Sequence, residues 1–131
     1  MTDSARPEGG LSKLERLCGK REIATLLENG RWGGGACLRF CCRVREETED
    51  AAPDRMMVSV PKKHFKRAVR RNLLKRRIRE AFRRQKSLLH EAGDGVRYDI
   101  LFTYASAEVA SFEEIRTAVA TILTEVRGWQ R

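Results

Sequence analysis

The chain has 131 residues, of which 41% are hydrophobic, so one core and a single domain are expected. It carries 27 Lys and Arg against 18 Asp and Glu, a formal net charge of +9 that indicates a polyanionic partner. No stretch approaches the roughly 20 apolar residues that a membrane span requires. The first residues also lack the apolar region of a secretion signal. We therefore expect a cytoplasmic protein with no membrane partner.

Residues 1–12 have the composition of a disordered tail, which leaves 13–131 as the predicted domain. Four cysteines lie in that domain at positions that form no CxxC pair and no zinc spacing. They are Cys18, Cys37, Cys41 and Cys42. Buried, reduced thiols are expected, in keeping with a reducing compartment.

The first half of the chain predicts a helix followed by two strands. The helix covers 20–28, and a glycine run at 33–35 is interpreted as a flexible connection. The first strand, 37–44, alternates between an apolar face and a partly cationic face. The apolar face holds Leu38, Phe40, Cys42 and Val44, and the other face holds Cys37, Arg39, Cys41 and Arg43. An acidic loop at 46–54 is expected to join this strand, as a long hairpin, to a second strand at 55–60.

The positive charge is concentrated in one window. Residues 62–86 hold 13 of the 27 Lys and Arg and a single acid, Glu80, so this window contributes +12 and the rest of the chain −3. No Gly or Pro occurs between Ala68 and Gly93, which favours one long helix ending near residue 89 or 90. At 100° per residue its apolar stripe consists of Leu74, Ile78, Ala81, Phe82, Gln85 and Leu89. The opposite face consists of Ala68, Asn72, Arg76, Arg79 and Arg83.

Like charges in a column on one helix face repel one another unless nearby acids neutralise them, and no acid at i+4 is expected to do so here. Arginine outnumbers lysine in the window, which suits bidentate contact to phosphate oxygens. The pattern therefore favours binding to RNA or DNA. A solvated surface helix and a membrane-surface or calmodulin-target helix are the alternatives.

The remainder of the chain predicts one strand and one helix. Tyr98, Ile100, Phe102 and Tyr104 alternate along the strand, which follows a turn at 93–95. Ser111 and Glu114 form the S-x-x-E pattern of a capping box, ahead of an apolar stripe that starts at Ile115. The expected element order is αββαβα.

The sequence provides no catalytic constellation. A phosphodiesterase needs carboxylates that hold metal ions or a histidine pair for acid–base chemistry. His64 and His90 lie 26 residues apart, and Asp99 is an isolated strand carboxylate, for which a structural role is expected. We therefore predict no catalytic residue and no metal ligand in this chain.

The basic window resembles the signature of the bacterial ribonuclease P protein subunit. The matching pairs, in the order and spacing of that family, are Lys62-Lys63, Ala68-Val69, Arg71-Asn72, Lys75-Arg76, Arg79-Glu80 and Phe82-Arg83. The resemblance implies an α/β (α+β) sandwich similar to the second domain of ribosomal protein S5, with a left-handed βαβ crossover through the basic helix. It also implies that an RNA subunit using Mg²⁺ removes the 5′ leader of precursor tRNA. This protein would bind that catalytic RNA and the precursor tRNA, hold no cofactor tightly, and be monomeric without RNA.

The resemblance assigns two groups of site residues. The RNA-binding positions are Lys62, Lys63, Arg67, Arg71, Asn72, Lys75, Arg76, Arg79 and Arg83. For a cleft that binds the single-stranded leader, between the sheet and the first helix, the matched positions are Ile23 and Leu27. Trp32 is the nearest aromatic besides Phe40, which is expected in the core, and Arg39 and Arg43 are expected to line the cleft floor. Arg71 falls on the apolar side of the helical wheel, so it is expected to reach past the helix start.

The sequence departs from the family in two places. Ile23 and Leu27 occupy helix positions where many members have Phe, and His64-Phe65 replaces a Gly that often follows the Lys-Lys pair. The alternative function is a non-enzymatic RNA-binding protein such as a ribosomal protein, which would show the same electrostatics. A helix-turn-helix DNA-binding protein is disfavoured because strands flank the basic helix.

Overall fold

The structure, a computed structural model, describes residues 15–17, 19–46, 53–90 and 95–130. Its helices are α1 (Lys20–Asn29), α2 (Ala68–Gln85) and α3 (Phe112–Arg127), with short 3₁₀ helices η3 (Lys86–Leu89) and η4 (Gly128–Gln130). Its strands are β1 (Arg31–Gly35), β2 (Leu38–Glu46), β3 (Arg55–Ser59) and β4 (Val96–Tyr104). This mixed α+β architecture confirms the predicted fold class.

The four strands form one sheet in the order β1-β2-β4-β3. β1 and β2 are antiparallel, as are β2 and β4, whereas β3 runs parallel to β4. Strand β4 shows the predicted alternation, because Tyr98, Ile100, Phe102 and Tyr104 belong to one buried cluster and Leu101 belongs to another. Helix α2 connects the parallel pair.

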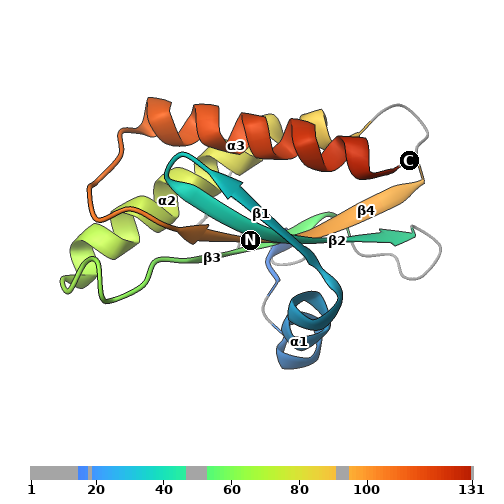
Figure 1. Ribbon diagram of the computed structural model, residues 1–131, viewed down its shortest axis with the longest axis horizontal. Helices are drawn as coiled ribbons and strands as arrows, with labels where there is room; N and C mark the ends of the chain where they lie inside the picture. The colour runs from blue at the N-terminus through green and yellow to red at the C-terminus, as the bar shows by residue number, and fades with distance from the viewer. Residues whose placement is uncertain (1–14, 18, 47–52, 91–94, 131) are drawn as a thin grey trace, which may run out of the picture.

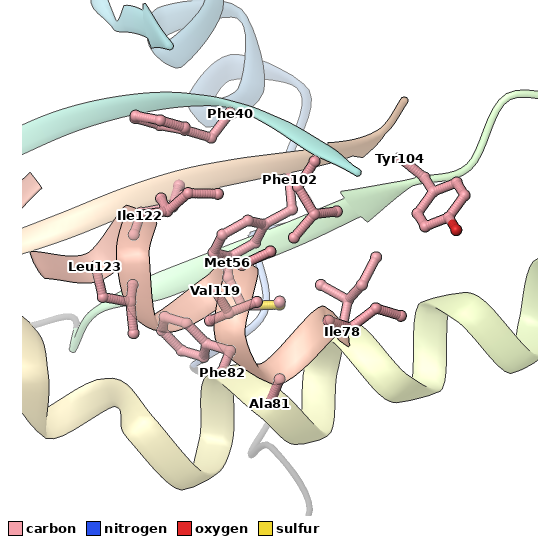
Figure 2. Packing of buried hydrophobic residues seen from close by; sticks show 14 of the residues in the cluster. Phe40, Met56, Ile78, Ala81, Phe82, Phe102, Tyr104, Val119, Ile122 and Leu123 are labelled. Carbon is pink, nitrogen blue, oxygen red and sulfur yellow. The ribbon is translucent and has the colours of Figure 1, made fainter. Parts of the chain in front are cut away.

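The main core lies between the sheet and two long helices. Figure 1 shows α2 and α3 together on one side of the sheet and α1 on the other. In Figure 2, Phe40, Met56 and Phe102 of the sheet face side chains of both helices. The contributing helix residues are Ile78, Ala81 and Phe82 from α2 and Val119, Ile122 and Leu123 from α3. Both apolar stripes predicted from the sequence are therefore confirmed.

The opposite face of the sheet is only partly covered. A smaller cluster of Leu17, Leu26, Cys41 and Leu101 joins it to α1, with Ile23 and Met57 packed against the edge of that cluster. The helix is short, at ten residues, so it shields one part of this face and leaves the rest accessible. We call the uncovered part the open sheet face.

A buried carboxylate lies on the same side of the sheet as α1. Asp99 Oδ1 accepts hydrogen bonds from Nε of both Arg45 and Arg55 at 3.0 Å, and Arg43 lies 3.8 Å from Oδ2. Asp99 and Arg45 are each 1% exposed. A buried charge must be paired, and these guanidinium groups pair it. The structural role predicted for Asp99 is therefore confirmed.

The predicted element order αββαβα was wrong by one strand. Gly33–35, interpreted as a flexible connection, belongs to β1, which pairs with β2 from Arg31 opposite Cys42 to Gly35 opposite Leu38. Packing requires glycine at position 33, since a Cβ there would come within 2.7 Å of the Phe40 ring. Strand propensity did not predict β1, because glycine is depleted in strands.

The expected hairpin between β2 and β3 was also wrong. β4 lies between them, and β3 pairs with β4 in parallel, for example Met57 with Leu101. A strand that is buried on both faces takes the central position, and β4 is such a strand. Local sequence spacing does not encode this nonlocal pairing.

The structure confirms several local predictions. Ser111 and Glu114 form the capping box of α3. Cys41 and Cys42 are buried free thiols, as predicted, whereas Cys37 is a free thiol that is only half-buried, and burial raises the pKa of each. The tail at 1–12, Cys18 and most of the acidic loop and of the turn at 93–95 lie outside the described residues. The left-handed crossover and the likeness to ribosomal protein S5 stay predictions.

Candidate nucleic-acid interface

The packing of α2 determines which of its side chains face outward. Its α3 side is fixed by Arg77, whose Nη1 donates to the Ala110 carbonyl at 2.6 Å, and by Gln85, whose Nε2 donates to the Arg116 carbonyl at 3.1 Å. On its other side, Lys86, the first residue of η3 directly after α2, forms an ion pair with Glu15. The face between these two sides exposes Asn72, Arg76 and Arg79.

Arg76 and Arg79 are the centre of this face. Among the residues that the structure describes, no carboxylate lies within ion-pair distance of either guanidinium. Partial burial and the charge of Arg16 lower the pKa of Arg79, although a guanidinium stays charged at neutral pH. Adjacent like charges raise the free energy of the folded chain, and phosphate groups would remove that cost.

Arg83 differs from the rest of the predicted column. Its Nε donates to Oε1 of Glu80 at 2.9 Å, and Arg84 donates to the other oxygen of the same carboxylate at 2.6 Å. The hydrogen bond from Arg83 is the largest cause that lowers the pKa of Glu80 to about 2. The expectation that no acid relieves the column was therefore wrong at this end of α2, because Glu80 neutralises part of the charge there.

The start of α2 adds further cations. Lys62 and Lys63 are exposed in the turn that follows Pro61. Arg67 occupies the N-cap position and makes no side-chain capping bond. Arg71 reaches back past the helix start, as predicted, and its Nη1 donates to the carbonyls of Phe65 and Lys66 at 2.7 and 2.8 Å.

Next to these cations is a polar pocket of about 400 Å³. Its lining is His64, Phe65, Lys66, Arg67 and Arg70. Lys66, Arg67 and Arg70 are exposed, so the cationic surface continues from the loop onto the first turn of α2. Lys75 is half-buried and lies between this end and Arg79.

Sequence reasoning missed Arg16. A bridge between Arg16 and Met56, with Leu17 N donating to the Met56 carbonyl at 2.9 Å, attaches this segment to the outer edge of β3. Arg16 is exposed and close enough to act on the pKa of Arg79. It extends the cationic surface from α2 toward the sheet. No sequence signal was available, since the two residues are far apart in the chain.

Three of the predicted leader-cleft residues share one face of the sheet. Trp32 lies opposite Cys41, Arg39 opposite Thr103 and Arg43 opposite Asp99. Directly opposed residues point to the same face, and Cys41 belongs to the cluster beneath α1. Trp32 is 51% exposed and Arg39 is also exposed, so both are accessible on the open sheet face.

The other predicted cleft residues are less accessible or less central. Ile23 is half-buried against the α1 cluster, and Leu27 is exposed on α1. Arg43 is half-buried near Asp99. Phe40 is buried in the main core, as expected. The structure therefore presents Trp32 and Arg39 as the accessible pair, with Ser59 opposite Thr103 on the next strand.

The described residues contain no group of three or more His, Cys, Asp or Glu that could hold a metal ion. None of the helices in the described part of the chain has the length and apolar character to cross a membrane.

Comparisons with known proteins agree with the basic-helix signature. A family profile described as Ribonuclease P matches residues 11–127. The ribonuclease P protein component of Porphyromonas gingivalis is 38% identical over 121 residues, which cover 91% of this chain and 88% of that protein. That of Chlorobaculum tepidum is 31% identical over 130 residues, which cover 92% of this chain and 81% of that protein.

Solved structures agree with the fold. The RNase P protein from Thermotoga maritima is similar with a TM-score of 0.67 at 24% identity, covering 85% of this chain and 96% of that chain. The Staphylococcus aureus RNase P protein also gives a TM-score of 0.67, at 22% identity, covering 85% of this chain and 94% of that chain. The family and sequence matches favour ribonuclease P over a ribosomal protein. The chain therefore belongs to the bacterial ribonuclease P protein family, whose members are protein subunits of an endoribonuclease.

Proposed function

We propose that this chain binds the catalytic RNA of ribonuclease P through the outward face of α2 and assists removal of the 5′ leader from precursor tRNA. The observation that carries the proposal is the pair Arg76 and Arg79, which are exposed and have no carboxylate partner among the described residues. Arg16 and Lys75 extend this surface, and Asn72 adds a group that can both donate and accept hydrogen bonds. Guanidinium groups arranged in this way suit phosphate oxygens.

The chemistry belongs, in this proposal, to the RNA subunit and the Mg²⁺ that it uses. Three carboxylates of the described residues already have cationic partners: Asp99 is held by arginines, Glu80 by Arg83 and Arg84, and Asp54 by His90. None of them is presented as a ligand for an ion. The protein contributes charge neutralisation, which raises the affinity for RNA and for substrate.

The leader of precursor tRNA would lie on the open sheet face. A single strand is held by stacking on aromatic side chains and by cations along its backbone. Trp32 offers an exposed ring and Arg39 an exposed guanidinium on this face. Arg16 lies between that face and the α2 surface, so one nucleic acid can contact both. In this proposal the protein acts in the cytoplasm and is monomeric without RNA.

The experiment combines the purified chain, a bacterial ribonuclease P RNA and a precursor tRNA at low Mg²⁺. Stimulated leader removal by the mixture, with none by the protein alone, is expected. Arg79→Ala should weaken assembly, whereas Arg84→Ala is the matched control, because Arg84 is bound by Glu80 and stacks on Phe112 at 5.4 Å. Absence of stimulation, or equal loss in both variants, would contradict the proposal.

The leader contact is tested separately with Trp32→Ala. Loss of one stacked base costs about 1–3 kcal/mol, so affinity for a precursor with a long leader should fall about tenfold. Affinity for a precursor whose leader is cut to one nucleotide should be unchanged. An equal loss for both substrates would remove Trp32 from the leader path without affecting the assignment of α2.

A further inference from the structure

A second surface of the chain is apolar and acidic, in contrast to the cationic face of α2. A groove of about 630 Å³ lies between the tip of the β1–β2 hairpin and α3, which are close together in Figure 1. Ala118 and Ile122 are buried and form its apolar floor. Its rims are formed by Gly34, Gly35, Ala36 and Cys37 on the hairpin side and by Glu113, Glu114, Thr117, Thr121 and Glu125 on the helix side, with Ser106 at one end.

The hairpin side of the groove is an open sheet edge. β1 is the terminal strand in the order β1-β2-β4-β3, so alternate residues direct backbone N–H and C=O groups away from β2. The other edge, β3, is partly paired through Leu17 N and the Met56 carbonyl. Nothing in the described part of the chain pairs with the outer side of β1. Its glycines carry no side chains that would keep another strand away.

The helix side of the groove is acidic. The lining contains Glu113, Glu114 and Glu125 and no Lys or Arg. Hydrogen bonds lower the pKa of Glu113, from Arg116, and of Glu114, from Ser111, so both stay ionised at neutral pH. Arg116 already pairs with Glu113, which leaves Glu114 and Glu125 to attract a cation. On a chain of net charge +9 this surface repels RNA and favours a basic ligand.

We propose that the groove binds an extended, arginine- or lysine-bearing segment of another protein, which adds to β1 as a fifth strand. The dimensions agree: five residues of β1 span about 17 Å, and the α3 face from Glu114 to Glu125 spans about 16 Å. Side chains of an added strand alternate, so every second one points toward α3. Small apolar side chains there meet Ala118 and Ile122, and basic ones meet the glutamates. This proposal does not depend on the RNA-binding assignment.

The probe is an eight-residue peptide of alternating valine and arginine, acetylated and amidated at its ends. It is titrated into ¹⁵N-labelled full-length chain, and amide shifts are followed by NMR. Shifts are expected at Gly34, Gly35, Thr117 and Thr121, with a dissociation constant below about 1 mM. A peptide with glutamate in place of arginine, and one N-methylated at alternate residues, should each bind at least about tenfold more weakly.

A matched pair of glycine variants tests the location. Gly35 lies opposite Leu38, whose side chain enters the main core, so a side chain at position 35 would point toward α3 and fill the groove. A Cβ at Gly35 or at Gly128 meets nothing within 4 Å, and neither residue has a positive φ. Gly35→Leu should weaken peptide binding at least about tenfold, and Gly128→Leu should leave it unchanged.

The possible outcomes separate the partner classes. No binding at millimolar arginine peptide, or equal binding to the N-methylated peptide, overturns strand addition. Equal binding by Gly35→Leu and Gly128→Leu overturns the location. If ribonuclease P RNA shifts the same groove amides and displaces the peptide, the surface is a nucleic-acid site and the proposal is wrong. Unchanged RNA binding by both glycine variants confirms that they fold.

Discussion

Helices α2 and α3 pack on the same face of the sheet through equivalent apolar stripes but present opposite charge to solvent. Leu74, Ile78, Ala81 and Phe82 of α2 are buried, as are Ile115, Val119, Ile122 and Leu123 of α3. In total, α2 carries eight Arg and Lys and one Glu in 18 residues, whereas α3 carries two Arg and three Glu in 16. The core determines where each helix lies, and the outer face determines what it can bind.

The two helices also differ in how well each stabilises its own ends. α3 begins with a capping box and two glutamates, which favour the positive end of the helix dipole. α2 begins without a side-chain cap or an acid, and places Arg70 and Arg71 in that region. Those cations oppose the dipole. α2 therefore keeps a charge pattern that weakens it as a helix, which a binding role for that charge explains.

The largest expected effect tests the buried apolar stripes that α2 and α3 share. Leu74→Ala and Leu123→Ala each empty a site that is fully buried in the same core. Each should lower the free energy of unfolding by about 2–5 kcal/mol, measured by urea denaturation. If one helix tolerates its substitution while the other does not, the two stripes are not equivalent and the comparison fails.

The next largest effect tests the difference in charge between the outer faces of α2 and α3. Arg76→Ala combined with Arg79→Ala should weaken RNA binding by about tenfold or more while the chain stays folded. If about five cations of α2 contact phosphates, log affinity falls against log salt with a slope of roughly −4. The double variant should flatten that slope by about 1.4–1.8.

The control for this change lies on α3. Thr117→Ala with Thr121→Ala also alters two exposed side chains one turn apart on a long helix. Affinity and salt slope should stay at the wild-type values. An unchanged slope in the arginine variant would show that α2 does not meet the RNA.

Features set by nearby residues could be predicted from the sequence. The stripes of α2 and α3, the alternation of β2 and β4 and the capping box depend on spacings of two to four residues. The reach of Arg71 back to the Phe65 carbonyl follows from its place on the helical wheel. Pairing of Glu80 with Arg83 was also readable, since residues three apart are neighbours on a helix, but it was not predicted.

Features set by distant residues could not be predicted. The placement of β4 between β2 and β3 depends on burial of both its faces in the assembled sheet. The glycine run of β1 was misinterpreted because the partner of Gly33, the Phe40 ring, becomes evident only once the strands pair. Arg16 reaches the α2 surface only through its bridge to Met56. These contacts arise from tertiary packing, which overrides local propensity.

A smaller effect concerns the helix starts. Ser111 Oγ accepts the Glu114 backbone N–H at 3.1 Å, so Ser111→Ala should cost about 1 kcal/mol in the free energy of unfolding. Arg67 occupies the same position in α2 but makes no capping bond, so Arg67→Ala should change stability by much less. Thermal unfolding of the two variants measures the difference. A loss with Arg67→Ala equal to that with Ser111→Ala would mean that α2 is capped in solution.

The smallest expected effect comes from removing the charge of Glu80, the single acid of α2. Glu80→Gln releases Arg83 and Arg84, so RNA affinity should rise about two- to threefold and the salt slope should steepen by about 1.

The same substitution should also lower the stability of the helix itself, by about 0.2–0.5 kcal/mol for each ion pair. The pKa of Glu80 is lowered from 4.5 to about 2, so its contribution is complete above pH 4.5 and is lost as the pH falls toward 2. The stability difference between wild type and variant should therefore disappear over that pH range.

Glu113→Gln is the matched control, because Glu113 pairs with Arg116 at the same i,i+3 spacing on α3. The pKa of Glu113 is likewise lowered by that arginine. Both variants should therefore show a small stability loss at neutral pH that fades in acid. Only Glu80→Gln should tighten RNA binding, since the guanidinium groups that it releases lie on α2. Equal RNA affinity in the two variants would mean that Arg83 and Arg84 lie outside the interface, which would then be limited to the first three turns of α2.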